Sequence, residues 1–563
     1  MMLMKKQNIR QCVVLLCGIV LAGLVSSKYF FRIDLTAEKR YTLSPETKQV
    51  LRRLDAPLYV HIYLDGDLPV QFRKFRNSIR EMLDDFRTYS ASRIVYRFVD
   101  PADASNRQER EEFYAFLEES GIQKITINKP NKDGSLSQQI IFPGAMLSYK
   151  DRGGVVNLLA NNRMLPWEMQ LNASLEALEY ELIKTVNMLS ADSIGRVAFT
   201  IGHGEPGMAE TFDLGNELSA FYEVEYKSIN GQLDALDPYK AVIIAKPRTA
   251  FDEKDKFIID RFIMRGGKVM WLIDGANVNT DSLTSANMTF ALATNLNLDG
   301  QLFTYGARIN PVVVQDMMYH PIQVTLTDGP ARMSAAPWLY YPLVNPSPDH
   351  AITRNLGPVW HRYASDIDTV GLDNGIRKSV LLRTSDLSRN RGLPCMISLD
   401  EVQIMPDPQQ FNKPHLITAV LLEGQFPSAF RFRNARSLFP DLQERQAEKS
   451  VTTKMIVVAD GDIARNDVRY TQRGYEPYPL GYDRYSGMTF ANKEFLVNAL
   501  NYLSDDAGLM NLRNREFKMR LLNKQKLNDE LLKWQMINLI LPMFLLLACG
   551  LAYHLWRRYN YGK

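Results

Sequence analysis

The strongest constraint on the fold of this chain lies near its C-terminal end, where residues 534–556 carry no charged side chain. As an α-helix rising about 1.5 Å per residue, this segment would be about 35 Å long, and the hydrocarbon core of a bilayer is about 30 Å thick. Pro542 is tolerated in a membrane helix at a kink. Residues typical of membrane interfaces occur at its ends: Lys533, Trp534, Tyr553, Trp556, Arg557 and Arg558. The sequence therefore predicts a transmembrane helix over 534–556; the alternative is a buried core helix.

A second hydrophobic segment, at residues 11–31, follows Lys5, Lys6 and Arg10. We expect a retained transmembrane helix, and the alternative is a cleaved signal peptide. Positive charges before a first span favour a cytoplasmic N-terminus, here residues 1–10, and a second span returns residues 557–563 to the cytoplasm. The long region between the two spans is then expected in the periplasm, anchored in a bacterial inner membrane.

The composition of the chain indicates a large folded protein. Its 563 residues are too many for one hydrophobic core, so two to four domains are expected. The net charge of +4, from 67 basic and 63 acidic residues that are well mixed, gives no sign of a nucleic-acid-binding surface. Cys395 is the only cysteine between the two hydrophobic segments, so no disulfide is expected within that region.

The region after the first hydrophobic segment is predicted to contain a linker and helix at 32–57 and a thioredoxin-like α/β domain at 58–165. Ser44 is suited to cap a helix that starts at Pro45. Apolar residues at helical spacing share one face of the next helix: Phe72, Phe75, Ile79, Met82, Leu83 and Phe86. Because the domain has no Cys-x-x-Cys pair, we expect a scaffold and not an oxidoreductase.

Residues 166–510 are predicted to form a larger, doubly wound α/β domain of amidotransferase-like or flavodoxin-like type. Strand and helix patterns alternate there, which is typical of a parallel sheet. The predicted strands are 196–201, 224–229, 240–245, 268–274 and 454–459, and the predicted helices are 209–221, 253–264 and 492–503. A mixed insertion is expected at about 276–450, with strand-like pieces such as 301–304 and 415–422.

The sharpest local feature is the loop that follows the strand at 196–201, with the sequence Gly202, His203, Gly204, Glu205. Open parallel sheets bind ligands beyond the carboxyl ends of their strands, and glycines let the backbone approach a ligand. His203 and Glu205 are therefore candidate ligand-binding residues. The alternative is that glycine serves only a tight turn and that the two side chains are solvated or bonded within it.

Two further clusters occur near the end of the second domain. Asp460, Asp462, Asn466 and Asp467 offer oxygen ligands, but their spacing is not that of an EF-hand, and a solvated turn is preferred to a metal site. Tyrosines that are suited to a protein-contact surface follow in the same loop: Tyr470, Tyr475, Tyr478, Tyr482 and Tyr485. Packing within their own domain is the alternative.

Several chemistries lack their motifs. The sequence has no Gly-x-x-x-x-Gly-Lys-Ser/Thr phosphate loop, no His-Glu-x-x-His and no Gly-x-Ser-x-Gly. We therefore expect no catalytic residues and no cofactor, and we do not expect this chain to be the ATPase of a transporter. The basic segment at 511–533 is expected to form a helix near the membrane surface, where its cations meet lipid phosphates or a partner.

Six sequence stretches resemble the gliding-motility-associated ABC transporter component GldG of Bacteroidetes, and together they run through most of the chain. They are residues 32–47, which read Arg-Ile-Asp-Leu-Thr-Ala-Glu-Lys-Arg-Tyr-Thr-Leu-Ser-Pro-Glu-Thr, the Gly202 loop, and residues 337–343, 478–483, 492–503 and 511–522. The resemblance implies an inner-membrane protein with a large periplasmic part that works with a separate permease and a separate ATPase. The family is labelled substrate-binding.

The leading hypothesis is a non-enzymatic periplasmic subunit of an ABC-type complex, which couples the permease and the ATPase to an envelope ligand or protein partner. One alternative is a degenerate amidotransferase-like envelope hydrolase that uses the Gly202 loop, although that loop offers no nucleophile. Another alternative is a purely structural envelope tether, in which the Gly202 loop is dispensable.

Overall fold

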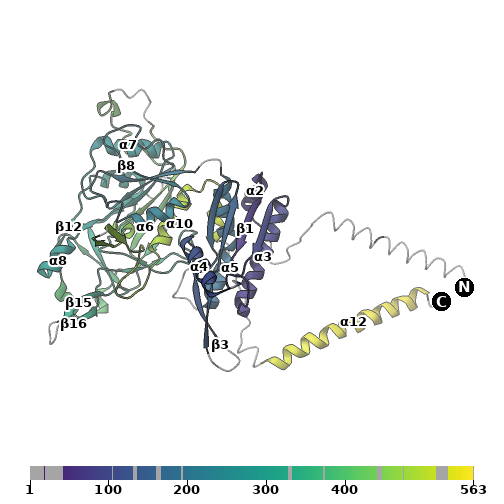
Figure 1. Ribbon diagram of the computed structural model, residues 1–563. Helices are drawn as coiled ribbons and strands as arrows, with labels where there is room; N and C mark the ends of the chain where they lie inside the picture. The colour runs from purple at the N-terminus through teal and green to yellow at the C-terminus, as the bar shows by residue number, and fades with distance from the viewer. Residues whose placement is uncertain are drawn as a thin grey trace. The chain divides into compact units, whose positions relative to one another are not determined.

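The structure, a computed structural model, divides the chain into two units that are described separately (Figure 1). One unit is Thr42–Arg515, and the other combines Met1–Tyr41 with Glu516–Lys563. The described residues are 18, 42–103, 106–130, 136–159, 167–191, 194–326, 332–371, 375–440, 447–472, 474–514 and 530–561. The predicted N-terminal span, apart from Gly18, and most of the predicted basic helix lie outside these residues.

The N-terminal part of the larger unit is a four-stranded sheet with helices. The sheet order is β2-β1-β5-β6, in which β1 is parallel to β2 and antiparallel to β5. Its elements are α2 (Pro45–Arg53), β1 (Leu58–Ile62), α3 (Val70–Tyr89), β2 (Ile94–Phe98), α4 (Arg107–Glu119), the hairpin β3 (Ile125–Pro130) and β4 (Leu136–Ile141), β5 (Gly144–Tyr149), β6 (Arg152–Asn157) and α5 (Trp167–Ser190). The predicted β-α-β-α order at the start of this domain is present.

Burial and capping explain why these helices form where they do. Ser44 caps α2, since its side chain accepts a hydrogen bond from the backbone N–H of Thr47. On α3 the buried residues are Phe72, Phe75, Ile79, Leu83 and Phe86, at helical spacing. The carboxylate of Glu179, on α5, accepts hydrogen bonds from the Ser44 N–H at 2.8 Å and the Thr47 hydroxyl at 2.7 Å, so α2 is bound to α5.

A nine-stranded sheet forms the centre of the second part, in the order β18-β17-β20-β23-β24-β10-β9-β7-β8. Its parallel half consists of β7 (Arg196–Ile201), β8 (Glu223–Ser228), β9 (Ala241–Ala245), β10 (Lys268–Leu272) and β24 (Thr453–Val458). If these five strands are numbered 1 to 5 along the chain, their order across the sheet is 2-1-3-4-5, which is the flavodoxin-like order. The predicted α/β class is confirmed.

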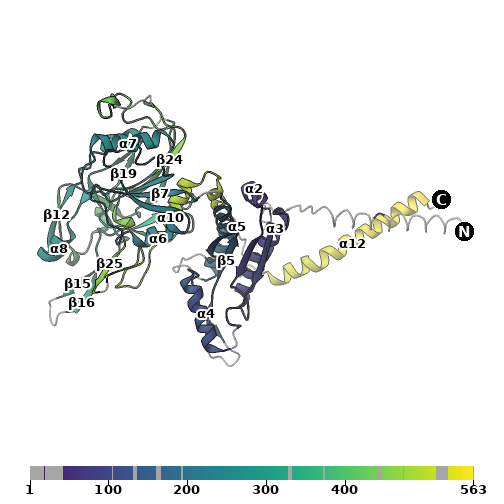
Figure 2. The same ribbon diagram turned by 45° about the horizontal axis from the view of Figure 1, so that its top comes forward.

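Helices cover both faces of this sheet (Figures 1 and 2). Helices α6 (Phe212–Ser219) and α10 (Asn492–Ser504) pack into one core with Phe199 and Met270. Helices α7 (Glu253–Met264) and α9 (Asp299–Tyr305) pack into a second core that includes Trp271. The sheet is therefore doubly wound.

The segment 276–450, expected as an insertion, adds four antiparallel strands to the same sheet. They are β17 (Leu343–Pro346), β18 (Val359–Trp360), β20 (Arg377–Arg383) and β23 (Ile417–Gly424). The prediction of a strand at 301–304 was wrong, because these residues lie in α9. Leu302 and Tyr305 are both buried there, at the i, i+3 spacing of a helix face, and short apolar runs do not separate strand from helix.

Smaller sheets and short helices complete this part. They are β11 (Ala276–Asn277), α8 (Thr280–Ala286), β12 (Met288–Ala293), β13 (Ala307–Ile309), β14 (Val312–Asp316), β15 (Ile322–Leu326), β16 (Arg332–Ala336), β19 (Ile367–Thr369), β21 (Ser388–Gly392), β22 (Cys395–Ser398), η1 (Leu399–Gln403), η2 (Pro408–Gln410), η3 (Ala435–Ser437), η4 (Asp462–Ala464), β25 (Val468–Thr471), β26 (Gly474–Pro477) and η5 (Leu509–Asn514).

Helix α12 (Leu531–Tyr561) belongs to the other unit and contains Pro542. Within the described residues, one helix is long and apolar enough to cross a membrane, and it is Lys533–Tyr559 of α12, with a mean hydropathy of 2.1. None of its most apolar stretch is buried against protein. These properties support the C-terminal membrane helix predicted at 534–556.

Candidate functional site

The candidate site lies where the central parallel strands end. Gly202 follows β7, Lys246 follows β9, Asp274 lies just beyond β10, and Asp460 lies just beyond β24. Because these strands are parallel and adjacent, their carboxyl ends share one edge of the sheet. Strand order reverses between β7 and β9, and open α/β sheets bind ligands at such a switch point.

Glycine is required at two positions of the loop after β7. Gly202 and Gly204 have φ angles of +121° and +77°, which favour glycine. A Cβ atom on Gly202 would lie 3.1 Å from the Ser228 hydroxyl oxygen, and one on Gly204 would lie 3.1 Å from the Cβ of Arg248. The chain turns sharply here and passes close to the segments that follow β8 and β9.

The side chain of His203 is turned into the protein. Its ring stacks on Phe251 with centroids 3.7 Å apart, and its Nε2 lies 3.1 Å from the Oδ2 of Asp255 on α7. Its backbone carbonyl accepts hydrogen bonds from the N–H groups of Arg248, at 2.7 Å, and Thr249, at 2.9 Å. Only 8% of the residue is exposed. His203 therefore holds the loop against α7 and the segment after β9.

Glu205 completes this network from the other side of the imidazole. Its Oε1 lies 3.7 Å from the Nδ1 of His203 and accepts a hydrogen bond from the Thr200 hydroxyl at 3.0 Å. Its Oε2 accepts the backbone N–H of His203 at 2.6 Å. The side chain is 1% exposed, so the carboxylate points inward.

The charges of this network favour a protonated histidine. Burial opposes charging of the imidazole, but the neighbouring carboxylates of Asp255, at 3.1 Å, and Glu205, at 3.7 Å, outweigh it and raise the pKa of His203 to about 9. Burial alone would raise the pKa of both carboxyl groups, yet the bonds from His203 and from backbone N–H groups lower it. An imidazolium between two carboxylates is the result.

The four residues predicted at this loop thus lie together, but the two side chains bond inside the protein. The imidazole contacts two carboxylates and an aromatic ring, and no hydroxyl or thiol among the described residues bonds to it. These contacts fix the loop to its neighbours, and they do not pair the imidazole with a nucleophile that it could activate as a base. A ligand-binding role for Gly202, His203, Gly204 and Glu205 stays a prediction.

A second charged cluster, which the sequence did not reveal as a unit, lies at the ends of β9, β10 and β24. The ammonium of Lys246 lies 2.8 Å from Asp274 Oδ2 and also pairs with Asp462. All three side chains are less than 15% exposed. Burial opposes the charge of Lys246, but the two carboxylates raise its pKa, whereas burial raises the pKa of Asp274.

Asp460 lies beside this cluster and is fully buried. Its Oδ2 is 2.7 Å from the Nδ1 of His361 and accepts the backbone N–H of Arg362 at 2.9 Å. Ligand oxygens of Asp274, Asp460 and Asp462 lie within 4.8 Å of one another, a separation that a cation could bridge. The ammonium of Lys246 already supplies a positive charge to two of these carboxylates.

The other two residues of the predicted oxygen cluster point elsewhere. Asn466 bonds to the backbone of Ala209 and Asp213, and Asp467 pairs with Arg362 at 3.1 Å. The four oxygen-bearing side chains at 460–467 therefore do not converge on one point. Their bonds hold the end of β24 to the segment around α6 and to Arg362.

The predicted tyrosine surface is divided between exposed and packed side chains. Tyr470, Tyr475 and Tyr485 are 76%, 45% and 52% exposed. Tyr478 and Tyr482 are half-buried and stack on each other with centroids 5.9 Å apart. Tyr475 and Tyr485 are thus exposed to solvent, whereas Tyr478 and Tyr482 pack on each other within the loop. A partner-contact role for Tyr475, Tyr478, Tyr482 and Tyr485 stays a prediction.

Individual known proteins resemble this chain weakly. The chain is 24% identical over 248 residues to a protein of Borreliella burgdorferi described as uncharacterized, a match that covers 42% of this chain and 43% of that protein. The chain thus spans less than half the length of this curated relative. A solved structure, the mmIFT52 N-terminal domain, aligns with a TM-score of 0.31 and 12% identity over 55% of this chain and 97% of that one.

Two family matches cover the two α/β parts. Residues 37–148 match a family described as a domain of unknown function. Residues 195–499 match the family described as an ABC-type uncharacterized transport system, and this region includes the parallel sheet, the Gly202 loop and the tyrosines. Because this second match covers more than half of the chain, the protein belongs to the ABC-type uncharacterized transport system family.

Proposed function

We propose that this protein is a non-enzymatic, membrane-anchored subunit that couples a separate ABC permease and ATPase to a cell-envelope ligand or partner. Its family assigns it to an ABC-type transport system, as an accessory component. The observation that carries the proposal is the combination of that family region with the exposed apolar helix Lys533–Tyr559. The sequence lacks a phosphate loop, so ATP hydrolysis falls to another subunit.

The proposed location is the bacterial inner membrane, with the Thr42–Arg515 unit in the periplasm and both termini in the cytoplasm. The basic residues before the first hydrophobic segment support this orientation. The resemblance to GldG of Bacteroidetes supports it as well and suggests a role in gliding motility or envelope function. Protease added to intact spheroplasts is expected to digest the Thr42–Arg515 unit. Digestion only after lysis would contradict this location.

Within the unit, we assign the coupling surfaces to the carboxyl edge of the parallel sheet and to the tyrosine loop. The Gly202 loop is rigid because its imidazolium, two carboxylates and backbone bonds all lie inside the protein. A loop that is already rigid can transmit the position of a bound partner to the sheet, because binding does not have to order the loop at a cost in free energy. Tyr475 and Tyr485 supply exposed aromatic area within the same family region, residues 195–499.

Reconstitution of the host's permease and ATPase in proteoliposomes, with and without this chain, tests the function. Addition of the chain is expected to change the rate of ATP hydrolysis. A variant with Tyr475→Ala and Tyr485→Ala, which alters only exposed side chains, separates coupling from folding. An unchanged rate with the intact chain would contradict a coupling subunit and favour a passive tether. Hydrolysis of an envelope substrate that His203→Ala abolishes would favour the amidotransferase-like alternative.

A further inference from the structure

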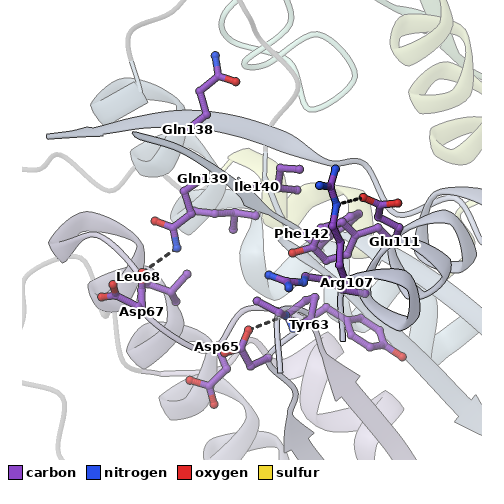
Figure 3. Close-up of a pocket in the computed structure, with 16 residues that line it drawn as sticks. Tyr63, Asp65, Asp67, Leu68, Arg107, Glu111, Gln138, Gln139, Ile140 and Phe142 are labelled. Atoms are coloured by element: carbon purple, nitrogen blue, oxygen red, sulfur yellow. Dashed lines mark hydrogen bonds and ion pairs between the residues drawn. The ribbon is translucent and has the colours of Figure 1, made fainter. Parts of the chain in front are cut away.

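The N-terminal α/β part contains a pocket of about 500 Å³ (Figure 3). It lies at the carboxyl ends of the two parallel strands β1 and β2, because Tyr63 and Asp65 follow β1 and Asp100 follows β2. Residues of α4 and β4 close it on the other sides, and Figure 3 shows Arg107, Gln139 and Tyr63 around it. Its volume and place are those of small-molecule sites in α/β folds.

Three of the six charged side chains that line the pocket form ion pairs within the protein. Arg107 pairs with Glu111 at 2.7 Å on the exposed side of α4, and Asp65 pairs with Arg76. The dashed line to Glu111 in Figure 3 marks the first of these pairs. These paired groups neutralise each other, so they contribute little net charge to the pocket.

Arg110 is different. It lines the pocket one helical turn after Arg107, and its Nε is buried. Among the described residues, neither a carboxylate nor a carbonyl bonds to its guanidinium. A buried guanidinium N–H without an acceptor is costly, so an acceptor is expected from outside the chain. A carboxylate fits best, because the planar guanidinium binds it in bidentate fashion.

Asp100 supplies the opposite charge. Its Oδ1 accepts the backbone N–H of Ala102 at 2.9 Å, while its Oδ2 has no partner among the described residues. Its carboxylate packs on Gly66, where a Cβ atom would lie 2.2 Å from Oδ2. Asp100 and Arg110 are not within ion-pair distance of each other. An unpaired anion and an unpaired cation therefore line one pocket.

Two further groups of the pocket are suited to a polar ligand. The Nε2 of Gln139 donates to the Asp67 carbonyl at 2.7 Å, whereas its Oε1 is buried and has no donor among the described residues. The phenol of Tyr114 lies near both charges: burial raises its pKa, Arg110 lowers it and Asp100 raises it. An amide N–H of a ligand would satisfy Gln139.

We propose that this pocket binds a small zwitterion, namely an amino acid or short peptide, with its carboxylate on Arg110 and its ammonium on Asp100. In a peptide, the amide N–H additionally donates to Gln139. The side chains of this pocket lie outside the family region 195–499, so binding there is independent of the transporter assignment.

Isothermal titration of the full-length chain in mild detergent with alanyl-alanine tests the proposal. Two capped probes remove one charge each: N-acetyl-alanyl-alanine lacks the ammonium and alanyl-alanine amide lacks the carboxylate. Alanyl-alanine is expected to bind at least about 10-fold more tightly than either capped probe, since each loses one charge-assisted hydrogen-bonded contact.

The variants identify the residues. Arg110→Gln is expected to weaken alanyl-alanine binding by about 10- to 100-fold and to abolish discrimination against the amide. Asp100→Asn is expected to abolish discrimination against the N-acetylated probe. Arg73→Gln, an exposed residue of α3 outside the pocket, is the matched control. Circular dichroism melting of each variant establishes that it is folded.

Three results would overturn the proposal. The first is that alanyl-alanine, glycyl-glycine and glutamate all fail to bind at concentrations of about 10 mM, where even weak sites fill. The second is that folded Arg110→Gln binds alanyl-alanine as the parent chain does. The third is that both capped probes bind as tightly as the zwitterion.

Discussion

The buried imidazolium of His203 makes the Gly202 loop sensitive to one substitution in a different element. Asp255→Asn keeps the shape of the side chain and removes its charge. Asp255 also accepts the backbone N–H of Gly231 at 2.7 Å, a bond that the amide oxygen of asparagine can keep. The substitution therefore acts mainly on the 3.1 Å contact with His203 Nε2.

The size of the effect follows from the pKa of His203, which rises from 6.5 to about 9 in the folded protein. Each pKa unit corresponds to about 1.4 kcal/mol, so the charged form is favoured by about 3 kcal/mol net, after the two carboxylates have offset the opposing cost of burial. Asp255 is nearer to the ring than Glu205, whose Oε1 is 3.7 Å away. We assign about 2 kcal/mol to Asp255, which corresponds to about a 30-fold change in local opening.

Hydrogen–deuterium exchange at Arg248 and Thr249, whose N–H groups bond to the His203 carbonyl, measures this opening. Because the pKa of His203 is raised on folding, its charge stabilises the folded loop fully below pH 6.5. This stabilisation is lost as the pH rises through about 9. At pH 6 these two amides should exchange about 30-fold faster in the variant than in the parent chain, and the difference in exchange rate should become smaller by pH 10. Asp234→Asn, an exposed residue, is the control. Equal protection in parent and variant at pH 6 would refute the reasoning.

Three further substitutions test other contacts. Lys246→Met leaves Asp274 buried without its cation and leaves Asp462 with the more distant Arg465, at 3.6 Å. The substitution should destabilise the second α/β part by about 3–5 kcal/mol, measured as a lower melting temperature, and an unchanged melting temperature would contradict the buried pair. Gly66→Ala should lower the melting temperature more than Gly121→Ala does. Both glycines have φ above +90°, but only Gly66 packs on Asp100, so equal effects would mean that backbone strain alone matters. Tyr475→Ala should weaken partner capture with no change in melting temperature, whereas Tyr482→Ala, which breaks the stack with Tyr478, should lower that temperature; the reverse pattern would exclude the exposed tyrosine as a contact.

Local sequence patterns predicted the buried elements well. β7 and α7 have the predicted bounds, Arg196–Ile201 and Glu253–Met264. A continuous apolar run marks the strand, while Asp252 at the N-cap and Gly266 after the last turn delimit the helix. Such signals lie within a few residues of the element itself, so no knowledge of the tertiary structure is needed.

Features that depend on strand order could not be predicted in this way. Lys246, Asp274 and Asp462 meet because β9, β10 and β24 are neighbours, although β24 lies far along the chain. The same holds for β20 and β23, which extend the sheet from a segment that resembles an insertion. His203 and Glu205 were correctly placed on a loop, but the inward direction of their side chains depends on Asp255 and Phe251, about 50 residues away.

The most direct test of the account is purification of the full-length chain from host membranes in mild detergent, followed by identification of the proteins that remain bound. A permease subunit and an ATPase subunit should copurify in fixed ratio. They should dissociate when the chain lacks residues 530–561, which include α12. Recovery of the intact chain from the membrane with neither subunit bound would contradict an accessory role in an ABC transport system.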